Sequence, residues 1–297
     1  MNRFRSERGQ SLVLTTFFVA ALLGMAALVI DLGTWFRSQR DLQAVADSAA
    51  LAGAQGLPDG GKASAYANQY TNKNGANGPT VTFPNADQIK VALQRPAPGF
   101  FARVFGVNSV TIRASATAKS FIPGEARYAA PIAVDERHPL IAGCHPNPCF
   151  NTPTDLELEK VGPGAFRLIN IDGSHGGTGP GILEDWLLKG YAGWMPIDWY
   201  FSDSGAKFNS SSIQSALTKR IGTEMLFPVY SNTRGGGANF EYKVIGWIGF
   251  VITSFEARGN NGILHGYFTR VVWEGIEGKS GGDPADDFGM RSIELIE

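Results

Sequence analysis

The chain begins with an uncharged, strongly apolar run from Leu12 to Ile30. At about 1.5 Å of rise per helical residue, this run reaches the roughly 30 Å thickness of a bilayer's hydrocarbon core. The first acidic residue after it, Asp31, does not end the helical pattern, and no proline follows before Pro58. The pattern therefore predicts one helix from Leu12 to Ala54 that leaves the membrane at Asp31.

Beyond Asp31 the helical pattern has an apolar and a polar side. The polar side carries Arg37, Arg40, Asp41, Ala44, Asp47 and Ser48. The apolar side becomes a face of small residues toward its end and consists of Leu32, Trp35, Phe36, Leu42, Ala46, Ala49 and Gly53. So narrow a face predicts close packing against a sheet or another helix.

A small α/β module is predicted next. Residues 60–70 have a helical pattern, residues 88–93 alternate as a strand, residues 98–106 read as a short helix, and residues 109–120 form a second strand. One side of that second strand is rich in alanine and carries Val110, Ile112, Ala114, Ala116 and Ala118. We expect this side to receive the small-residue face of the long helix.

The remainder is β-rich after a linker at residues 121–127. We predict strands at 165–171, 240–255, 263–275 and 290–297, and a helix at 210–222 whose Ser211 and Gln214 form a capping box. The strand at 240–255 is apolar on both sides, which indicates a central, doubly covered position. The predicted fold class is α+β, with a cytoplasmic N-terminus (1–11), a transmembrane helix (12–31), a pilin-like stalk helix with the small module (32–122) and a β-rich extracytoplasmic domain (123–297).

The charges beside the apolar run indicate its orientation. Arg3, Arg5 and Arg8 precede it with a single acid, Glu7, whereas the flank after it mixes both signs. The positive-inside rule predicts a single-pass protein of the inner (cytoplasmic) membrane with a cytoplasmic N-terminus and a periplasmic bulk. A cleavable signal peptide is the alternative, but its apolar region is typically only about 7–15 residues long.

Three strings in this region carry a family resemblance: "RGQSL", "VIDLG" and "RDLQAVADSAALAGA". They resemble the N-terminal module of Tad (tight adherence, Flp-type) pilus-assembly proteins of the TadE/TadG kind, over about the first 56 residues. The matching positions are Gly9, Gln10, Asp31, Gly33, Leu42, Gln43, Asp47, Ala50, Leu51 and Gly53. The resemblance implies a membrane-anchored structural component that contacts other pilus or secretion-apparatus proteins.

Two features of the span bear on assembly. Prepilins have a leader that ends in glycine and a glutamate five residues later; here Gly9 is followed at that distance by Leu14, which cannot pair with a new N-terminal ammonium. We therefore expect an uncleaved, TadG-like anchor. Ala20 and Gly24 form a small-xxx-small pair that suits a membrane-helix partner, although small residues also occur on lipid-facing helices.

Charge and the cysteines add further constraints. With 26 Lys+Arg against 27 Asp+Glu the chain has no electrostatic support for nucleic-acid binding. Cys144 and Cys149 are the only cysteines, and in an exported domain they predict a disulfide; metal binding with His145 is the alternative and lacks a fourth ligand nearby. "INIDGSHGG" resembles the start of a von Willebrand A metal site, but Gly176 replaces a serine, so we favour a turn in which Asp172 bonds its own backbone.

No catalytic motif accompanies the four histidines, and we expect neither enzymatic activity nor a cofactor. An anchored hydrolase remains a lesser alternative. A second alternative is an exported adhesin or carbohydrate-binding head, because aromatic side chains gather in one segment, although core packing is the commoner use of such residues. This candidate platform consists of Trp186, Tyr191, Trp194, Trp199 and Tyr200.

Overall fold

The computed structural model describes residues 8–144, 147–158, 167–203, 208, 210–258, 261–271 and 281–296, with the backbone alone for residues 8–10, 258, 261 and 284. The chain forms two compact units. The first comprises residues 1–120 together with 293–297, and the second comprises residues 121–292. Helices and sheets are both present, which confirms the α+β fold class.

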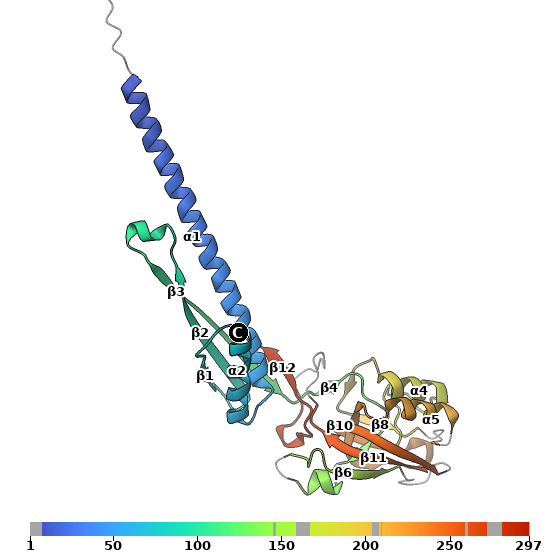
Figure 1. Ribbon diagram of the computed structural model, residues 1–297. Helices are drawn as coiled ribbons and strands as arrows, with labels where there is room; N and C mark the ends of the chain where they lie inside the picture. The colour runs from blue at the N-terminus through green and yellow to red at the C-terminus, as the bar shows by residue number, and fades with distance from the viewer. Residues whose placement is uncertain are drawn as a thin grey trace, which may run out of the picture. The chain divides into compact units, whose positions relative to one another are not determined.

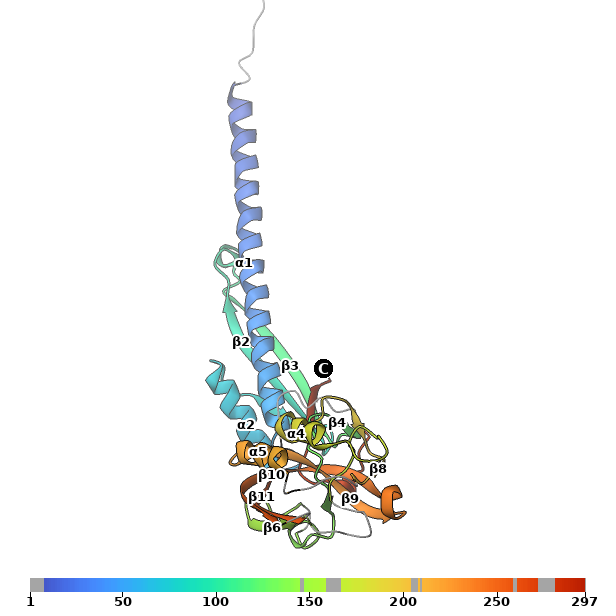
Figure 2. The ribbon, with the colours of Figure 1, turned by 90° about the vertical axis from the view of Figure 1, so that its right-hand side faces the viewer.

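The first unit is built on one long helix, α1 (Arg8–Ala54), which passes through Asp31 without interruption (Figures 1 and 2). This confirms the single helix predicted from the pattern. A second helix, α2 (Gly60–Lys73), packs beside its C-terminal end. Asp59 caps α2, because its side chain accepts a hydrogen bond from the Lys62 amide at 3.0 Å.

A four-stranded sheet completes this unit, in the order β1 (Thr80–Thr82), β2 (Gln88–Pro98), β3 (Ser109–Phe121) and β12 (Ser292–Leu295). Strands β2 and β3 form an antiparallel hairpin whose tip contains a short 3-10 helix, η1 (Ala102–Phe105). Strand β12 comes from the far end of the sequence, so the last residues belong to the first unit and not to the β-rich domain predicted for residues 123–297. It continues along the outer edge of β3, where the Ile296 amide donates to the Thr117 carbonyl at 2.9 Å.

The core of the first unit joins α1 to the sheet. It contains, among others, Leu42, Ala46, Ala49 and Ala50 from α1 and Ile112, Ala114, Ala116 and Ala118 from β3. This confirms the predicted pairing of small-residue faces. The prediction was wrong for the first residues of the apolar side, because Leu32 and Phe36 are exposed. At this level of α1, the side chains of Trp35 and Gln39 face the hairpin instead and bond its backbone.

The second unit is centred on a sheet in the order β5 (Val134–Asp135), β9 (Glu224–Arg234), β10 (Glu241–Arg258), β11 (Asn261–Thr269) and β6 (Pro153–Glu157), with β8 (Trp199–Phe201) also paired to β10. All pairs are antiparallel except β5 with β9. Residues Gly246–Phe250 of β10 are buried without alternation, which confirms the central, doubly covered position. Two short strands, β4 (Glu125–Ala126) and β7 (Met195–Pro196), form a separate pair.

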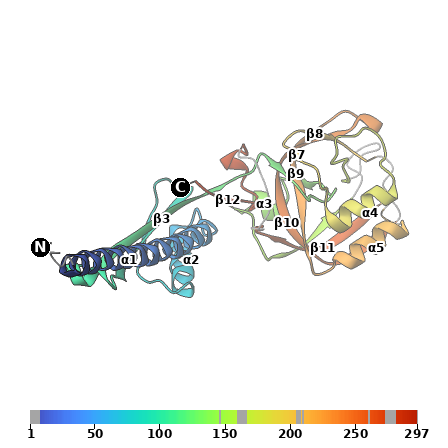
Figure 3. The ribbon, with the colours of Figure 1, turned by 90° about the horizontal axis from the view of Figure 1, so that it is seen from above.

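Helices α4 (Pro180–Lys189) and α5 (Ser211–Arg220) lie side by side (Figure 3) and contribute Leu183, Leu187, Ile213 and Leu217 to the same core as the sheet. The α5 cap is Ser210 and not the predicted Ser211, since the Ser210 hydroxyl accepts from the Ile213 amide. The described part of the predicted strand 165–171 makes only isolated bridges at Leu168 and Ile169. The predicted strand 263–275 ends at Thr269, and residues 272–275 lie outside the described residues.

Candidate assembly and anchoring site

The N-terminal half of α1 presents an apolar surface that nothing else in its unit covers. Within the described residues, α1 is the one helix long and apolar enough to cross a membrane, and its most apolar stretch is not buried in the chain. At Gly24 a methyl group in place of the hydrogen would meet no atom within 4 Å, and Ala20 is exposed. This face is therefore open to lipid or to another helix.

Asp31 ends the apolar run and is fully buried. One carboxylate oxygen accepts from the Phe100 amide at 3.0 Å, and the other accepts from the amides of Phe101 and Ala102 at 3.0 and 2.6 Å. These donors open the first turn of η1, where amides lack intrahelical partners. The negative charge of Asp31 is thus stabilised by three amide dipoles, and it fastens the hairpin tip to α1.

Asp31 is the first of four α1 side chains at four-residue intervals that bond the hairpin backbone. The Trp35 indole donates to the Pro98 carbonyl at 3.0 Å, Gln39 donates to the Arg113 carbonyl at 2.6 Å, and Gln43 donates to the Ser115 carbonyl at 3.0 Å. Residues four apart lie on one helix face, so this spacing makes a continuous row. We call Asp31, Trp35, Gln39 and Gln43 the polar row.

The polar row gives a structural role to the motif residues Asp31 and Gln43. It also contains Trp35 and Gln39, which do not belong to the motif. Gln43 also donates to the Asp47 carboxylate at 2.8 Å, so both of its amide hydrogens are used and Asp47 orients the side chain. The hydrophobic pattern puts Trp35 on the apolar side of the helix, and it gives no role to Gln39. Their four-residue spacing from Asp31 is the signal in the sequence that identifies them.

The C-terminal half of α1 holds the small motif residues in close contact. Leu42 and Ala50 are fully buried, and Leu51 is partly buried against the same core. At Gly53 a methyl group would lie 2.5 Å from Ile89 Cδ1, 3.1 Å from the Ala63 carbonyl and 3.3 Å from Ala67 Cβ. Glycine at this position therefore permits the close approach of α2.

Among the described motif positions, Gly33 has no such contact. Gly33 is exposed, and a methyl group there would meet no atom within 4 Å. Gly9 and Gln10 belong to the first turn of α1, and their side-chain surroundings lie outside the description. Packing within this chain accounts for Asp31 and the motif residues from Leu42 to Gly53, and not for Gly33.

The five aromatic residues of the candidate platform are not gathered on one surface. Trp186 and Tyr200 belong to the core, and the Tyr200 hydroxyl donates to the Pro196 carbonyl at 2.7 Å. Tyr191 packs edge-on against Trp186, with ring centroids 5.7 Å apart. Because the core takes the apolar area of Trp186 and Tyr200, a platform of all five rings does not form.

The two outer tryptophans are each covered by a guanidinium group. Arg127 lies over the Trp194 ring at 5.4 Å from its centroid, and Arg234 lies over Trp199 at 4.2 Å. Each guanidinium group thus occupies one face of the indole ring that it covers.

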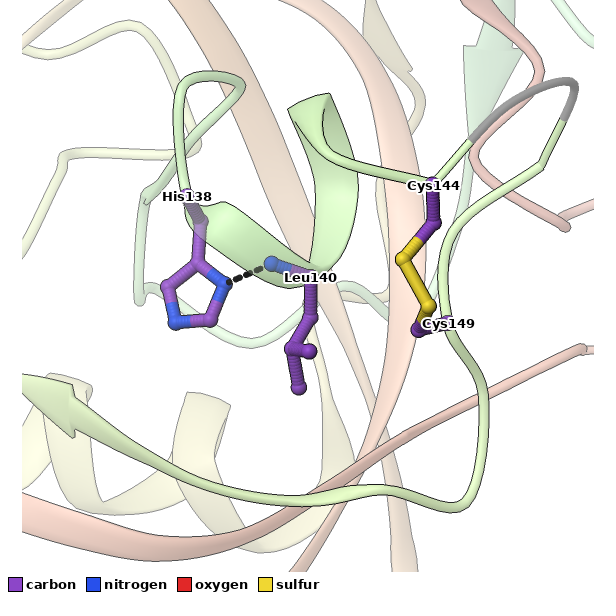
Figure 4. The surroundings of a disulfide bond; sticks show 4 residues. All are labelled: His138, Leu140, Cys144 and Cys149. Carbon is purple, nitrogen blue, oxygen red and sulfur yellow. Dashed lines mark hydrogen bonds between the residues drawn. A yellow bond between two sulfur atoms is a disulfide. The ribbon is translucent and has the colours of Figure 1, made fainter.

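The cysteine pair closes a short loop after α3 (Pro139–Ala142). Cys144 and Cys149 form a disulfide with their Cα atoms 5.5 Å apart (Figure 4). Nearby, the Leu140 amide donates to Nδ1 of His138 at 3.2 Å, and burial lowers the pKa of His138 below its ordinary value. Disulfide-bonded sulfurs are not thiolate ligands, so the alternative metal site loses two of its donors; its third, His145, lies outside the described residues.

The predicted turn at Asp172 is confirmed, since its carboxylate accepts from the Ser174 amide at 2.9 Å. The largely antiparallel sheet of this unit also differs from the doubly wound parallel sheet that a von Willebrand A domain would require. In the described part of the chain, no three His, Cys, Asp or Glu side chains converge in a metal-binding group.

Comparison with protein families places the N-terminal segment. Residues 9–56 match the Tad family, described as putative Flp pilus-assembly TadE/G-like. Comparison with curated proteins and with solved structures gave no match. The matched segment contains the apolar half of α1, the polar row and the close-packed end of the helix, and it confirms the resemblance seen in the sequence. The chain therefore carries a TadE/G-like pilus-assembly module at residues 9–56.

Proposed function

We propose that this protein is a TadG-like, single-pass component of a Tad/Flp-type pilus or secretion apparatus that acts through protein–protein contacts without catalysis. The observation that carries the proposal is the division of α1 into two halves. The half before Asp31 is apolar and open, whereas the half after it is bonded to a sheet and a second helix. A membrane anchor joined rigidly to a folded body has this form.

The orientation follows from charge. Arg3, Arg5 and Arg8 favour the cytoplasmic side for the N-terminus, so the sheet, α2 and the second unit lie outside the inner membrane. The oxidising environment there suits the Cys144–Cys149 disulfide. Burial of Trp186 and Tyr200 removes the main observation behind an adhesin or carbohydrate-binding head, so we propose a single function.

Two positions probe partner contacts without disturbing the chain's own packing. A photo-crosslinking residue at Gly24 or at Gly33 faces open space, and the same residue at exposed Tyr66 on α2 is the matched control. We expect crosslinking in native membranes to capture Tad pilus or secretion-apparatus proteins at Gly24, Gly33 or both, and more strongly than at Tyr66. Absence of such proteins from all captured material contradicts the proposed function.

Retention of the N-terminus is tested separately. Because Leu14 stands where a prepilin has glutamate, we expect the intact mass of the purified membrane form to include residues 1–9. A mass that corresponds to cleavage after Gly9 contradicts the anchor and favours a fibre subunit.

A further inference from the structure

The tip of the β2–β3 hairpin is an exposed apolar surface. Its sequence from Phe100 to Phe105 is FFARVF, in which four of the six side chains are large and apolar. Val104 and Phe105 are each 82% exposed, and Phe100 is 59% exposed. Water is an unfavourable environment for a contiguous surface of this kind, which indicates an unassigned contact.

The height of this tip along α1 is set by hydrogen bonds and close packing. Asp31 accepts from the amides of Phe100, Phe101 and Ala102, and Trp35 donates to the Pro98 carbonyl. Gly99 fits tightly, since a methyl group there would lie 2.7 Å from the Val107 carbonyl and 3.6 Å from the Trp35 ring. Figures 1 and 2 show the tip beside the middle of α1. The tip is thus held at the level where the apolar run ends.

With α1 across the membrane as proposed above, that level is the surface of the bilayer. The run from Leu12 to Ile30 is only about as long as the hydrocarbon core is thick, so Asp31 lies at its outer boundary. Leu28, Val29 and Ile30 are exposed on α1 just before Asp31, and their surface is continuous with the lipid-facing helix. The apolar hairpin tip, held at this level, would therefore lie in contact with lipid.

We propose that the hairpin tip inserts its phenylalanines and Val104 into the outer surface of the same bilayer that α1 crosses, as a second membrane contact. The exposed Arg103 in the middle of the tip suits this position, because its guanidinium group reaches lipid phosphates while its stem stays among the apolar side chains. This second contact restricts the tilt and rotation of the sheet and α2 of the first unit relative to the membrane. It goes beyond the assembly role and rests only on insertion of α1.

The test uses the full chain in vesicles of phosphatidylethanolamine and phosphatidylglycerol, with a nitroxide-bearing lipid as quencher. A single environment-sensitive fluorophore is attached at Val104→Cys, at Leu23→Cys within the span, or at Tyr66→Cys on α2; the native cysteines stay in their disulfide without reductant. We expect emission at position 104 to be quenched at least about twofold more than at position 66, as for an interfacial segment.

Each outcome is decisive. Quenching at position 23 without quenching at position 104 overturns the proposed insertion and leaves the anchor intact. A label at position 104 that is shielded from the nitroxide lipid by a second copy or another protein has the same meaning. Absence of quenching at position 23 contradicts the anchor itself and, with it, this proposal. As a second variant, Phe100→Ser with Phe105→Ser in the Val104→Cys chain is expected to abolish quenching at 104, because the insertion needs these side chains; both are exposed, so the fold is retained.

Discussion

At the scale of single residues, Asp31 joins the apolar half of α1 to the tip of the β2–β3 hairpin. A carboxylate without solvent exposure is costly unless its charge is compensated, and here three backbone amides compensate it. The same bonds satisfy amides at the start of η1 that have no other backbone partner in the turn. One side chain therefore both ends the apolar run of α1 and fastens the hairpin tip.

Asp31→Asn is expected to loosen the hairpin tip. Both carboxylate oxygens accept from amides, so an asparagine must turn its own NH2 group toward at least one N–H donor. Loss of a charge-assisted hydrogen bond weakens the attachment by about 1.5–3 kcal/mol. A change of this size lowers the hydrogen-exchange protection of the Phe100–Ala102 amides about tenfold or more. Hydrogen exchange by mass spectrometry in detergent measures this change. Asp41→Asn on exposed α1 surface is the control, and equal exchange in both variants contradicts the assigned role.

At the scale of elements, α1 uses two different interfaces along one helix. Near Asp31 it bonds the hairpin backbone through the polar row, and beyond Leu42 it packs small residues against β3 and α2. The row also protects the sheet, because Gln39 and Gln43 bond to the carbonyls on the β3 edge that β12 leaves uncovered. Hydrogen bonds set the register, and close packing supplies the apolar burial.

Two glycines of α1 are expected to respond in opposite directions to substitution. Gly53→Val places new atoms against Ile89 and the α2 backbone and is expected to destabilise the first unit by about 1–3 kcal/mol. Gly33→Ala meets no neighbour and is expected to stabilise the helix by about 0.5–1 kcal/mol. Thermal unfolding in detergent compares the two variants with the native chain. A stable Gly53→Val variant would show that α2 does not pack as described.

A cross-strand pair gives the second unit a pH-dependent contribution. His265 of β11 lies opposite Asp155 of β6, with Nδ1 2.6 Å from the carboxylate; this hydrogen bond, with smaller charge contributions from Asp155 and Glu256, raises the pKa of His265. A raised folded-state pKa stabilises the fold fully below the unfolded value of about 6.5, and that contribution is lost as the pH rises through the folded value.

Asp155→Asn is therefore expected to lower the melting temperature of the second unit more at pH 5.5 than at pH 8.5. The pair is solvent-exposed, so the effect is below about 1 kcal/mol. Asp185→Asn, which removes an exposed carboxylate that pairs with Lys189 and not with a histidine, is the control. A loss that is larger at pH 8.5 contradicts the assignment.

At the scale of the whole molecule, the described residues form two separate hydrophobic cores. One joins α1, α2 and the first sheet, and the other joins the six-stranded sheet with α4 and α5. The two units are not two consecutive segments of the sequence, because β12 joins the first unit although it follows the second unit in the chain. The chain leaves the first unit after Ser120 and re-enters it at Ile293.

Removal of the disulfide is expected to affect one core alone. The Cys144–Cys149 bond closes a short ring within the second unit, and Cys144→Ser with Cys149→Ser is expected to destabilise that unit by at most about 2 kcal/mol. Hydrogen exchange at elevated temperature, followed separately in β10 and in α2, measures each unit. Equal destabilisation of α2 contradicts independent cores.

The locally repeating features of this protein follow from its amino-acid pattern alone. An uncharged run, helical spacing and alternating strand residues predicted α1, α2, the separate strands β2 and β3, and the central strand β10, because the spacing of apolar residues shows which side of an element is covered. The motif strings likewise identified the TadE/G-like module. These properties depend on residues close together in the chain.

Which groups meet across long separations in the chain depends on the folded arrangement of the elements. The three amides that bind Asp31 come from residues 100–102, β12 pairs with a strand far earlier in the chain, and the core buries Trp186 and Tyr200. Spacing along one element shows which side chains share a face, and it does not show what that face meets. The partner of a carboxylate and the burial of an aromatic ring depend on the packing of elements that the local pattern leaves unplaced.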